Sequence, residues 1–312
     1  MTIHQQEHIT VLLKEAVQRL IADPDGFYVD GTFGRGGHSE RILGELSESG
    51  RLLAIDKDEQ AVTSGNLRFA DDSRFEIVRG SFAQLTDYLM EREQMGKVAG
   101  MLLDLGVSSP QLDQTDRGFS FVDDGPLDMR MDHRVERTAA DWVNSADEDE
   151  LAFIFKEYGE ERFAKRIARA IIRSRRQQSI TTTLQLAKVV AAANPAWEKH
   201  KHPATRVFQA IRILINNELD DLDKVLAQSL DALMIGGRLV VISFHSLEDR
   251  RVKRFIQRQE SGDQLPAGVP VTQDQLNKRL RRIGKLTKPG ESELKQNKRA
   301  RSAVMRVAEK VA

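Results

Sequence analysis

The sequence predicts an α/β fold, a doubly wound parallel sheet interrupted by an inserted all-helical segment. Three observations predict it. The first hundred residues alternate short apolar runs with amphipathic stretches, an aperiodic segment follows, and a purely helical stretch then precedes a second buried strand. Such alternation is typical of βαβ units. A chain of 312 residues has room for about two domains and a sizeable core.

The N-terminal part is predicted to hold a first helix over residues 11–21 and then four strands with helices between them. The strands are expected at Phe27–Asp30, Leu52–Asp56, Phe75–Arg79 and Ala99–Asp104. The intervening helices are expected at residues 37–46, 58–69 and 81–93. Amphipathic segments of this length between apolar runs favour crossover helices.

After Asp104 the alternation stops. Residues 105–137 carry Gly, Pro, Asp and Ser at short intervals without a period, which predicts a long loop, and loops of that length are usually functional. Residues 138–202 look entirely helical and form the predicted insertion. The insertion is expected to recognise substrate, and the sheet domain then comprises residues 1–137 and 203–312.

One long amphipathic helix is predicted from Pro203 to Leu233, because apolar residues recur at about 3.6 residues. Gly236-Gly237 is expected to end it. A buried strand over Leu239–Phe244 and a final strand over Ala303–Val307 complete the predicted sheet.

The composition excludes several classes of function. Forty-seven basic and 47 acidic residues leave no global field for nucleic acid or membrane. The absence of cysteine excludes disulfides, thiolate zinc sites, iron–sulfur clusters and cysteine nucleophiles. The histidines show no metal-ligand spacing, so no metal is expected. Without a basic leader or an apolar run of about 18 residues, the chain is expected to be cytoplasmic and not bound to a membrane.

A glycine-rich turn, Asp30-Gly-Thr-Phe-Gly-Arg-Gly-Gly-His38, leaves the first strand. The dinucleotide pattern fails because Ser39 stands where Gly is needed, and the P-loop pattern fails because its Lys is missing. Asp56 ends the second strand, where a carboxylate can accept hydrogen bonds from both ribose hydroxyls. A ligand with a ribose and no phosphate fits best, and S-adenosylmethionine is the common one. The alternative is that the glycines only form a tight turn and Asp56 only caps a helix.

Blocks of sequence along nearly the whole chain resemble the ribosomal small-subunit RNA (cytosine-N4) methyltransferase H family, also called MraW. They are His8–Leu13, Asp30–His38, Leu102–Asp113, Arg117–Phe121, Gly125–Asp132, Tyr158–Arg162, Phe208–Arg212 and Ser243–Asp249. The resemblance implies a Rossmann-like class I methyltransferase that uses S-adenosylmethionine. It implies cofactor contacts at Gly36, Gly37, His38, Asp56, Phe82, Asp104 and Gln111.

The resemblance also implies a substrate, 16S rRNA within the small (30S) ribosomal subunit. The product would be N4-methylcytidine at a cytidine of the decoding region, position 1402. The oligomeric state stays open, with a homodimer as one alternative. Competing interpretations are a methyltransferase of another acceptor and a non-catalytic ribosome-assembly factor that binds RNA. A nicotinamide dehydrogenase is the weakest rival, because the dinucleotide pattern is broken.

Transfer to an exocyclic amine requires an acceptor for its N–H groups, because the nitrogen lone pair is delocalised into the ring. Asp104 at the end of the fourth strand, or the Ser108–Pro110 segment with Ser109, is the candidate. Asp104 could alternatively be only a helix or strand cap. Zero cysteines exclude the thiolate addition used for methylation at cytosine C5.

Further residues are candidates for contact with RNA. Phe119 and Phe121 could stack on an extruded base, or anchor the loop to the core. His245 could act as a base or a substrate contact, or be a structural histidine. A helical stripe and a basic stretch could bind phosphates, and the alternative for the stripe is a solvated face. The stripe is Arg162, Arg166, Arg169, Arg173 and Arg176, and the stretch is Lys278–Arg301.

Overall fold

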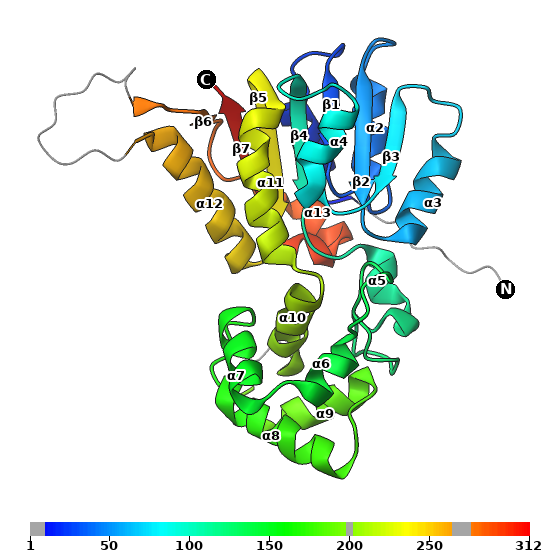
Figure 1. Ribbon diagram of the computed structural model, residues 1–312, viewed down its shortest axis with the longest axis vertical. Helices are drawn as coiled ribbons and strands as arrows, with labels where there is room; N and C mark the ends of the chain where they lie inside the picture. The colour runs from blue at the N-terminus through cyan, green and yellow to red at the C-terminus, as the bar shows by residue number, and fades with distance from the viewer. Residues whose placement is uncertain (1–9, 198–201, 264–275) are drawn as a thin grey trace, which may run out of the picture. The chain divides into compact units, whose positions relative to one another are not determined.

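The computed structural model describes residues 10–197, 202–263 and 276–312, except for the side chain of Ser109. The chain forms two compact units, described here separately (Figure 1). Unit 1 comprises residues 1–106 and 219–312, and unit 2 comprises residues 107–218. Unit 2 takes in more of the chain than the predicted insertion 138–202, whose residues 198–201 lie outside the described part. Its role in recognising substrate stays a prediction.

Unit 1 is built on a seven-stranded sheet of order β3-β2-β1-β4-β5-β7-β6. The strands are β1 Phe27–Asp30, β2 Arg51–Asp56, β3 Phe75–Arg79, β4 Val98–Asp104, β5 Leu233–Ser243, β6 Leu280–Arg282 and β7 Val304–Lys310. The first five pair in parallel, and β7 pairs antiparallel with both β5 and β6. The order reverses beside β1, which makes the sheet doubly wound and confirms the Rossmann-like class I methyltransferase fold.

Helices cover both faces of this sheet. The helices of unit 1 are α1 Leu13–Leu20, α2 Gly37–Glu45, α3 Glu59–Arg68, α4 Leu85–Glu91, α11 Glu218–Ala232, α12 Ser246–Ser261 and α13 Glu291–Gln296. One apolar cluster joins α4, α11 and α12 to side chains such as Leu53 and Val241. A second cluster joins α1 and α2 to the opposite side chains, such as Leu52 and Val240. Residues on both faces are therefore apolar, as expected of a buried parallel sheet.

Unit 2 is helical around its own core, which includes the fully buried Trp142 and Phe155. Its helices are α5 Ser109–Asp113, α6 Ala139–Ser145, α7 Glu148–Glu157, α8 Ala164–Gln177, α9 Thr183–Ala193 and α10 Ala204–Ile215. The prediction of an entirely aperiodic loop over 105–137 is wrong in part, because α5 and a 3₁₀ turn at Thr115–Arg117 lie within it. Ser108 and Gln111 form a capping box at the N-terminus of α5, and Pro110 lies in the first turn of this helix.

The single helix predicted from Pro203 to Leu233 is wrong. The chain forms α10 and α11, separated at Asn216 and Asn217, and Asn217 has a φ of 57°. The Asn216 amide explains the break, because its Oδ1 accepts from Met131 N at 2.7 Å and its Nδ2 donates to Met129 O at 2.8 Å. Gly236-Gly237 does not end the helix and lies within β5 instead. No helix among the described residues is long and apolar enough to cross a membrane.

Candidate active site

Three carboxylates stand at one edge of the sheet in unit 1. Asp30, Asp56 and Asp104 are the last residues of β1, β2 and β4, which are neighbours in the order β2-β1-β4. Because these strands are parallel, their carboxyl ends meet at the same edge, where open α/β sheets bind ligands.

Asp30 holds the glycine-rich turn that follows β1. Its Oδ1 accepts from Thr32 N at 3.1 Å, and its Oδ2 accepts from the Ser39 hydroxyl at 2.7 Å. The Thr32 hydroxyl in turn accepts from Asp104 N at 2.6 Å, which ties the turn to β4. Asp30 is fully buried, and burial raises its pKa. Its two oxygens are engaged within the turn, so the role it shows here is structural.

Gly36 and Gly37 connect this turn to α2, which begins at Gly37. Gly36 has a φ of 73°, a left-handed conformation that favours glycine. A Cβ on Gly37 would lie 1.9 Å from the Thr10 hydroxyl oxygen, and one on Gly36 would lie 2.6 Å from the Phe33 ring. A side chain at Gly36 or Gly37 would therefore force Phe33 or Thr10 to move, and the contact of these glycines with a cofactor stays a prediction.

Asp56 is held by two backbone N–H groups. Gly34 N donates to its Oδ2 at 2.7 Å, and Asp58 N donates to its Oδ1 at 2.8 Å. Burial nevertheless raises the pKa of Asp56 to about 6. Each carboxylate oxygen can accept more than one hydrogen bond. The ionised group is thus oriented by the turn and able to accept from a pair of vicinal hydroxyls.

Asp104 and His38 form a buried polar pair, with 3.6 Å between His38 Nδ1 and Asp104 Oδ2. Burial lowers the pKa of His38 to about 4, so the imidazole is neutral at neutral pH. Burial raises the pKa of Asp104 well above its ordinary value, and the charges of Asp30 and Glu248 add to that rise. Both His38 Nε2 and Asp104 Oδ1 are buried without a hydrogen-bond partner among the described residues.

Buried polar atoms usually have partners, so these two orphaned atoms indicate a place for a polar ligand. A ligand with a cationic group fits beside the Asp104 carboxyl, because an opposite charge favours the ionised form of a buried acid. The Asp56 carboxylate would accept hydrogen bonds from the ribose hydroxyls of that ligand. The residues present therefore fit S-adenosylmethionine, which combines a ribose with sulfonium and ammonium charges.

Phe82 lies on a turn that α11 fixes in place. Asp221 accepts from Lys57 Nζ at 2.5 Å and from the Ser81 hydroxyl at 2.7 Å. The Lys57 ammonium stands 5.9 Å from the centre of the Phe82 ring, and Gln228 donates to Ala83 O at 2.6 Å. Sequence reasoning missed Lys57 and Asp221, since 164 residues separate the two and no local pattern marks a contact of that range.

Gln111 and Ser109 belong to unit 2. Gln111 is buried, and its Oε1 accepts from Ser108 N at 3.0 Å in the box that caps α5. Ser109 is the first residue of α5, and its side chain lies outside the described part of the structure. The cofactor contact of Gln111 and the catalytic role of Ser109 both remain predictions.

The two phenylalanines proposed to stack on a base have partners within unit 2. Phe119 is buried in its core, and the Arg117 guanidinium lies 5.9 Å from its ring centre. Phe121 packs at 4.6 Å between ring centres on Phe208 and at 4.8 Å on His202. These contacts match the alternative of a loop anchored to the core, and base stacking stays a prediction.

The arginine stripe lies mainly on α8. Arg166, Arg169, Arg173 and Arg176 are exposed on that helix, while Arg162 precedes it with its guanidinium 5.4 Å from the Phe163 ring centre. Arg169 is paired with Glu148 at 2.8 Å. The opposite face, which includes Ile167 and Ile171, is buried.

His245 is the N-cap of α12. Its Nδ1 accepts from Glu248 N at 3.4 Å, and its Nε2 lies 3.0 Å from Glu248 Oε1. Glu248 Oε2 also accepts from Phe244 N at 2.8 Å. The geometry shows a capping histidine in unit 1, and a contact between His245 and substrate stays a prediction.

Residues 5–311 match the model of the MraW methylase family. The chain belongs to this family. The chain is also similar in structure to an rRNA methylase from Streptococcus thermophilus, with 12% identity, full coverage of both chains and a TM-score of 0.43. It is similar to TrmN from Thermus thermophilus, with 11% identity, 96% of this chain and 48% of that chain covered, and a TM-score of 0.44. At these identities and TM-scores, neither structure says more about the fold of this chain than its own sheet order does.

As a methylase with the class I sheet, this MraW chain is a methyltransferase that uses S-adenosylmethionine. The cofactor supplies an electrophilic methyl group on a sulfonium. Asp56 and Asp104 lie at the carboxyl edge of the sheet, and their contacts with the cofactor stay predictions.

Proposed function

We propose that this methyltransferase transfers a methyl group to the N4 amino group of a cytidine in the decoding region of 16S rRNA, within the small ribosomal subunit. Family membership and the motif blocks support an RNA substrate. The observation that carries the choice of an N4 amine is the resemblance of these motif blocks to the cytosine-N4 methyltransferases, and the buried carboxyl of Asp104 provides a hydrogen-bond acceptor for it.

Asp104 is proposed to accept a hydrogen bond from the N4 amine. This contact orients the nitrogen toward the methyl donor and makes its lone pair more available for attack. Neutral His38 beside it adds no positive charge that would compete with the amine. The raised pKa of Asp104 also suits it to take up a proton that the amine releases after transfer.

The Gly34–Asp56 contact is proposed to preset the ribose subsite, and the turn fixed by Asp221 is proposed to hold Phe82 beside the adenine. The arginine stripe on α8 is proposed to bind RNA phosphates, since its guanidiniums are exposed. The lack of cysteine leaves direct attack by nitrogen as the route, because addition of a thiolate to the ring has no nucleophile.

The test offers naked 16S rRNA and assembled small subunits to the full chain with methyl-labelled S-adenosylmethionine. We expect label in RNA, and loss of that label with Asp104→Asn. Label confined to ribosomal protein would support the rival acceptor. The other rival is a non-catalytic assembly factor, which would bind RNA but not S-adenosylmethionine. Calorimetry of cofactor binding distinguishes it from a methyltransferase.

A further inference from the structure

Four aromatic rings of unit 2 form a series that runs from its core to its surface. Phe208 of α10 is buried, and the Phe121 ring packs on it with 4.6 Å between the ring centres. The His202 ring packs on Phe121 at 4.8 Å, and the Trp197 ring packs on His202 at 5.6 Å. Trp197 is 63% exposed. This ring series therefore ends in an indole that its neighbours support and that lies mostly in solvent.

The support from neighbouring rings distinguishes Trp197 from an ordinary exposed apolar residue. Single exposed apolar side chains are common on protein surfaces, and Phe153 on α7 is one of them, at 60% exposed. The Trp197 ring instead packs on the His202 ring, which in turn packs on Phe121. Because the indole is held before any ligand arrives, a flat ligand can stack on it with little loss of side-chain entropy.

His202 adds a polar group beside the indole. Its Nδ1 accepts a hydrogen bond from Ala204 N at 3.1 Å, so Nε2 carries a proton. Because His202 is exposed, this N–H group is available to a ligand as a donor. A flat ligand with acceptor atoms on its edge satisfies both the indole and the imidazole, and nucleobases have this chemistry.

Unit 2 also carries the positive charge that an RNA ligand requires. Arg166, Arg169 and Arg173 are exposed on α8 of this unit. Cations that follow the phosphates, together with aromatic side chains that stack on the bases, are the combination with which proteins bind single-stranded nucleic acids. The charge and the ring series of unit 2 therefore fit the same class of ligand.

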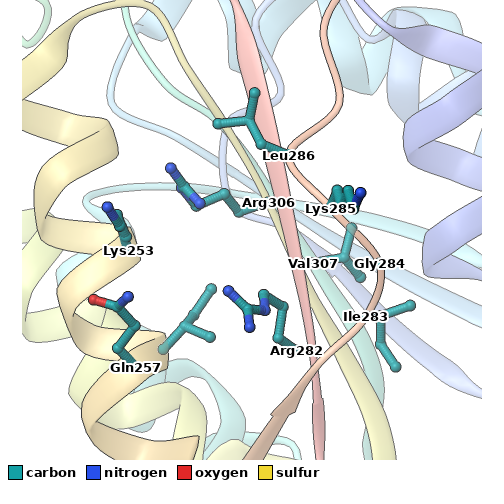
Figure 2. Close-up of a pocket in the computed structure, with 10 residues that line it drawn as sticks. Lys253, Gln257, Arg282, Ile283, Gly284, Lys285, Leu286, Arg306 and Val307 are labelled. Atoms are coloured by element: carbon teal, nitrogen blue, oxygen red, sulfur yellow. The ribbon is translucent and has the colours of Figure 1, made fainter.

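A hollow in unit 1 is too small to compete for a base. Lys253 of α12, Arg282 of β6 and Arg306 of β7 lie around it (Figure 2). Its volume is about 10 Å³, which is room for about one water molecule. The cations around this hollow therefore provide surface charge without a place for a base.

We propose that Trp197 and His202 bind an unpaired nucleobase of the RNA substrate. The base stacks on the indole, and His202 Nε2 donates a hydrogen bond to an acceptor on the edge of the base. Phe121 supports the His202 ring from the side of the core. This inference rests on the proposed function and adds to it a base contact in unit 2. Because every base has a face that can stack, the contact supplies affinity more than choice of sequence.

The first experiment compares Trp197→Ala with Phe153→Ala, a matched control that removes a similarly exposed ring of unit 2 outside the ring series. Binding of a fluorescent, single-stranded RNA fragment of the decoding region is measured by anisotropy at several salt concentrations. Loss of one stacked base in Trp197→Ala should weaken binding by about 5- to 150-fold. The slope of log affinity against log salt should keep its wild-type value, because no phosphate contact is lost.

Phe153→Ala should bind the RNA as the wild type does, and so should Trp197→Phe, because phenylalanine also stacks on bases. All three variants should bind S-adenosylmethionine with the wild-type affinity. Equal RNA affinity in Trp197→Ala and Phe153→Ala would overturn the base contact and leave the proposed function intact. Failure of the wild-type chain to bind RNA at all would overturn the proposed function, and this inference with it.

A second experiment uses the fluorescence of Trp197. The chain has two tryptophans, and Trp142 is fully buried, so Trp197 is the one that a ligand can reach. The RNA fragment should quench the emission of the wild type but not that of Trp197→Phe, and the same fragment made of abasic nucleotides should not quench it. Equal quenching by the abasic fragment would overturn the proposal. A change of emission with protein concentration in the absence of RNA would also overturn it, because the indole would then be the contact between two copies of the chain.

Discussion

Replacing Asp56 with Asn should change how the stability of unit 1 depends on pH. In the unfolded chain the carboxyl titrates near its ordinary value of 3.8, and in the folded unit its pKa is about 6. Because the folded pKa is the higher one, the wild type loses stability as pH rises from about 4 to about 6. Two units of pKa, at about 1.4 kcal/mol each, correspond to about 3 kcal/mol.

Asn cannot ionise, so Asp56→Asn removes this loss. The Asn side chain has only one acceptor oxygen, whereas Gly34 N and Asp58 N donate to two different oxygens of Asp56. The lost hydrogen bond costs about 1–3 kcal/mol of stability, and this cost does not depend on pH. The free-energy difference between variant and wild type should therefore shift by about 3 kcal/mol in favour of the variant between pH 4 and pH 7, whatever the fixed cost.

The assay is urea unfolding without cofactor, monitored by the hydrogen exchange of peptides from β1 and β2. Both tryptophans, Trp142 and Trp197, lie in unit 2, so their fluorescence does not report on unit 1. The matched control is Asp72→Asn, since the hydrogen bond from Arg74 lowers the pKa of Asp72. The stability that Asp72 contributes to the wild type is therefore lost only as pH falls. Parallel curves for Asp56→Asn and wild type would refute the reasoning.

Three further outcomes are expected. Asp104→Asn should bind S-adenosylmethionine more weakly and lose methyl transfer, and a parent-like rate with normal binding would exclude the side chain of Asp104 as acceptor. Gly37→Ala should destabilise unit 1 by about 1–3 kcal/mol through the clash with the Thr10 hydroxyl. Thr10→Ala should recover part of that loss in urea unfolding, and its failure to do so would contradict the clash. Arg166→Glu/Arg173→Glu should weaken RNA binding and its salt dependence while sparing cofactor affinity measured by calorimetry; unchanged RNA binding would leave the stripe a solvated face.

The strands were predictable because a sheet covered on both faces needs continuous apolar runs. β1 and β3 have the predicted bounds, and β2 and β4 each begin one residue earlier. The carboxyl edge was predictable for a different reason, because parallel strands end at the same edge and so place Asp30, Asp56 and Asp104 together.

The break between α10 and α11 was not predictable from periodicity. Apolar residues continue at helical spacing across Asn216, and the cause of the break is a set of hydrogen bonds to Met129 and Met131, 87 and 85 residues away. Asn217 in the left-handed region completes it, a conformation that Asn tolerates better than most residues. Long-range polar contacts of this kind, like that of Lys57 with Asp221, leave no local pattern.

The central claim is that the methyl group goes to the exocyclic nitrogen of a cytidine. Its most direct test is mass spectrometry of nucleosides from 16S rRNA, digested after small subunits that lack the modification are incubated with this methyltransferase and S-adenosylmethionine. The proposed chemistry predicts N4-methylcytidine, absent from the reaction with Asp104→Asn. Methylation at cytosine C5 or at a ribose hydroxyl, or RNA left unmethylated by a chain that binds the cofactor, would contradict it.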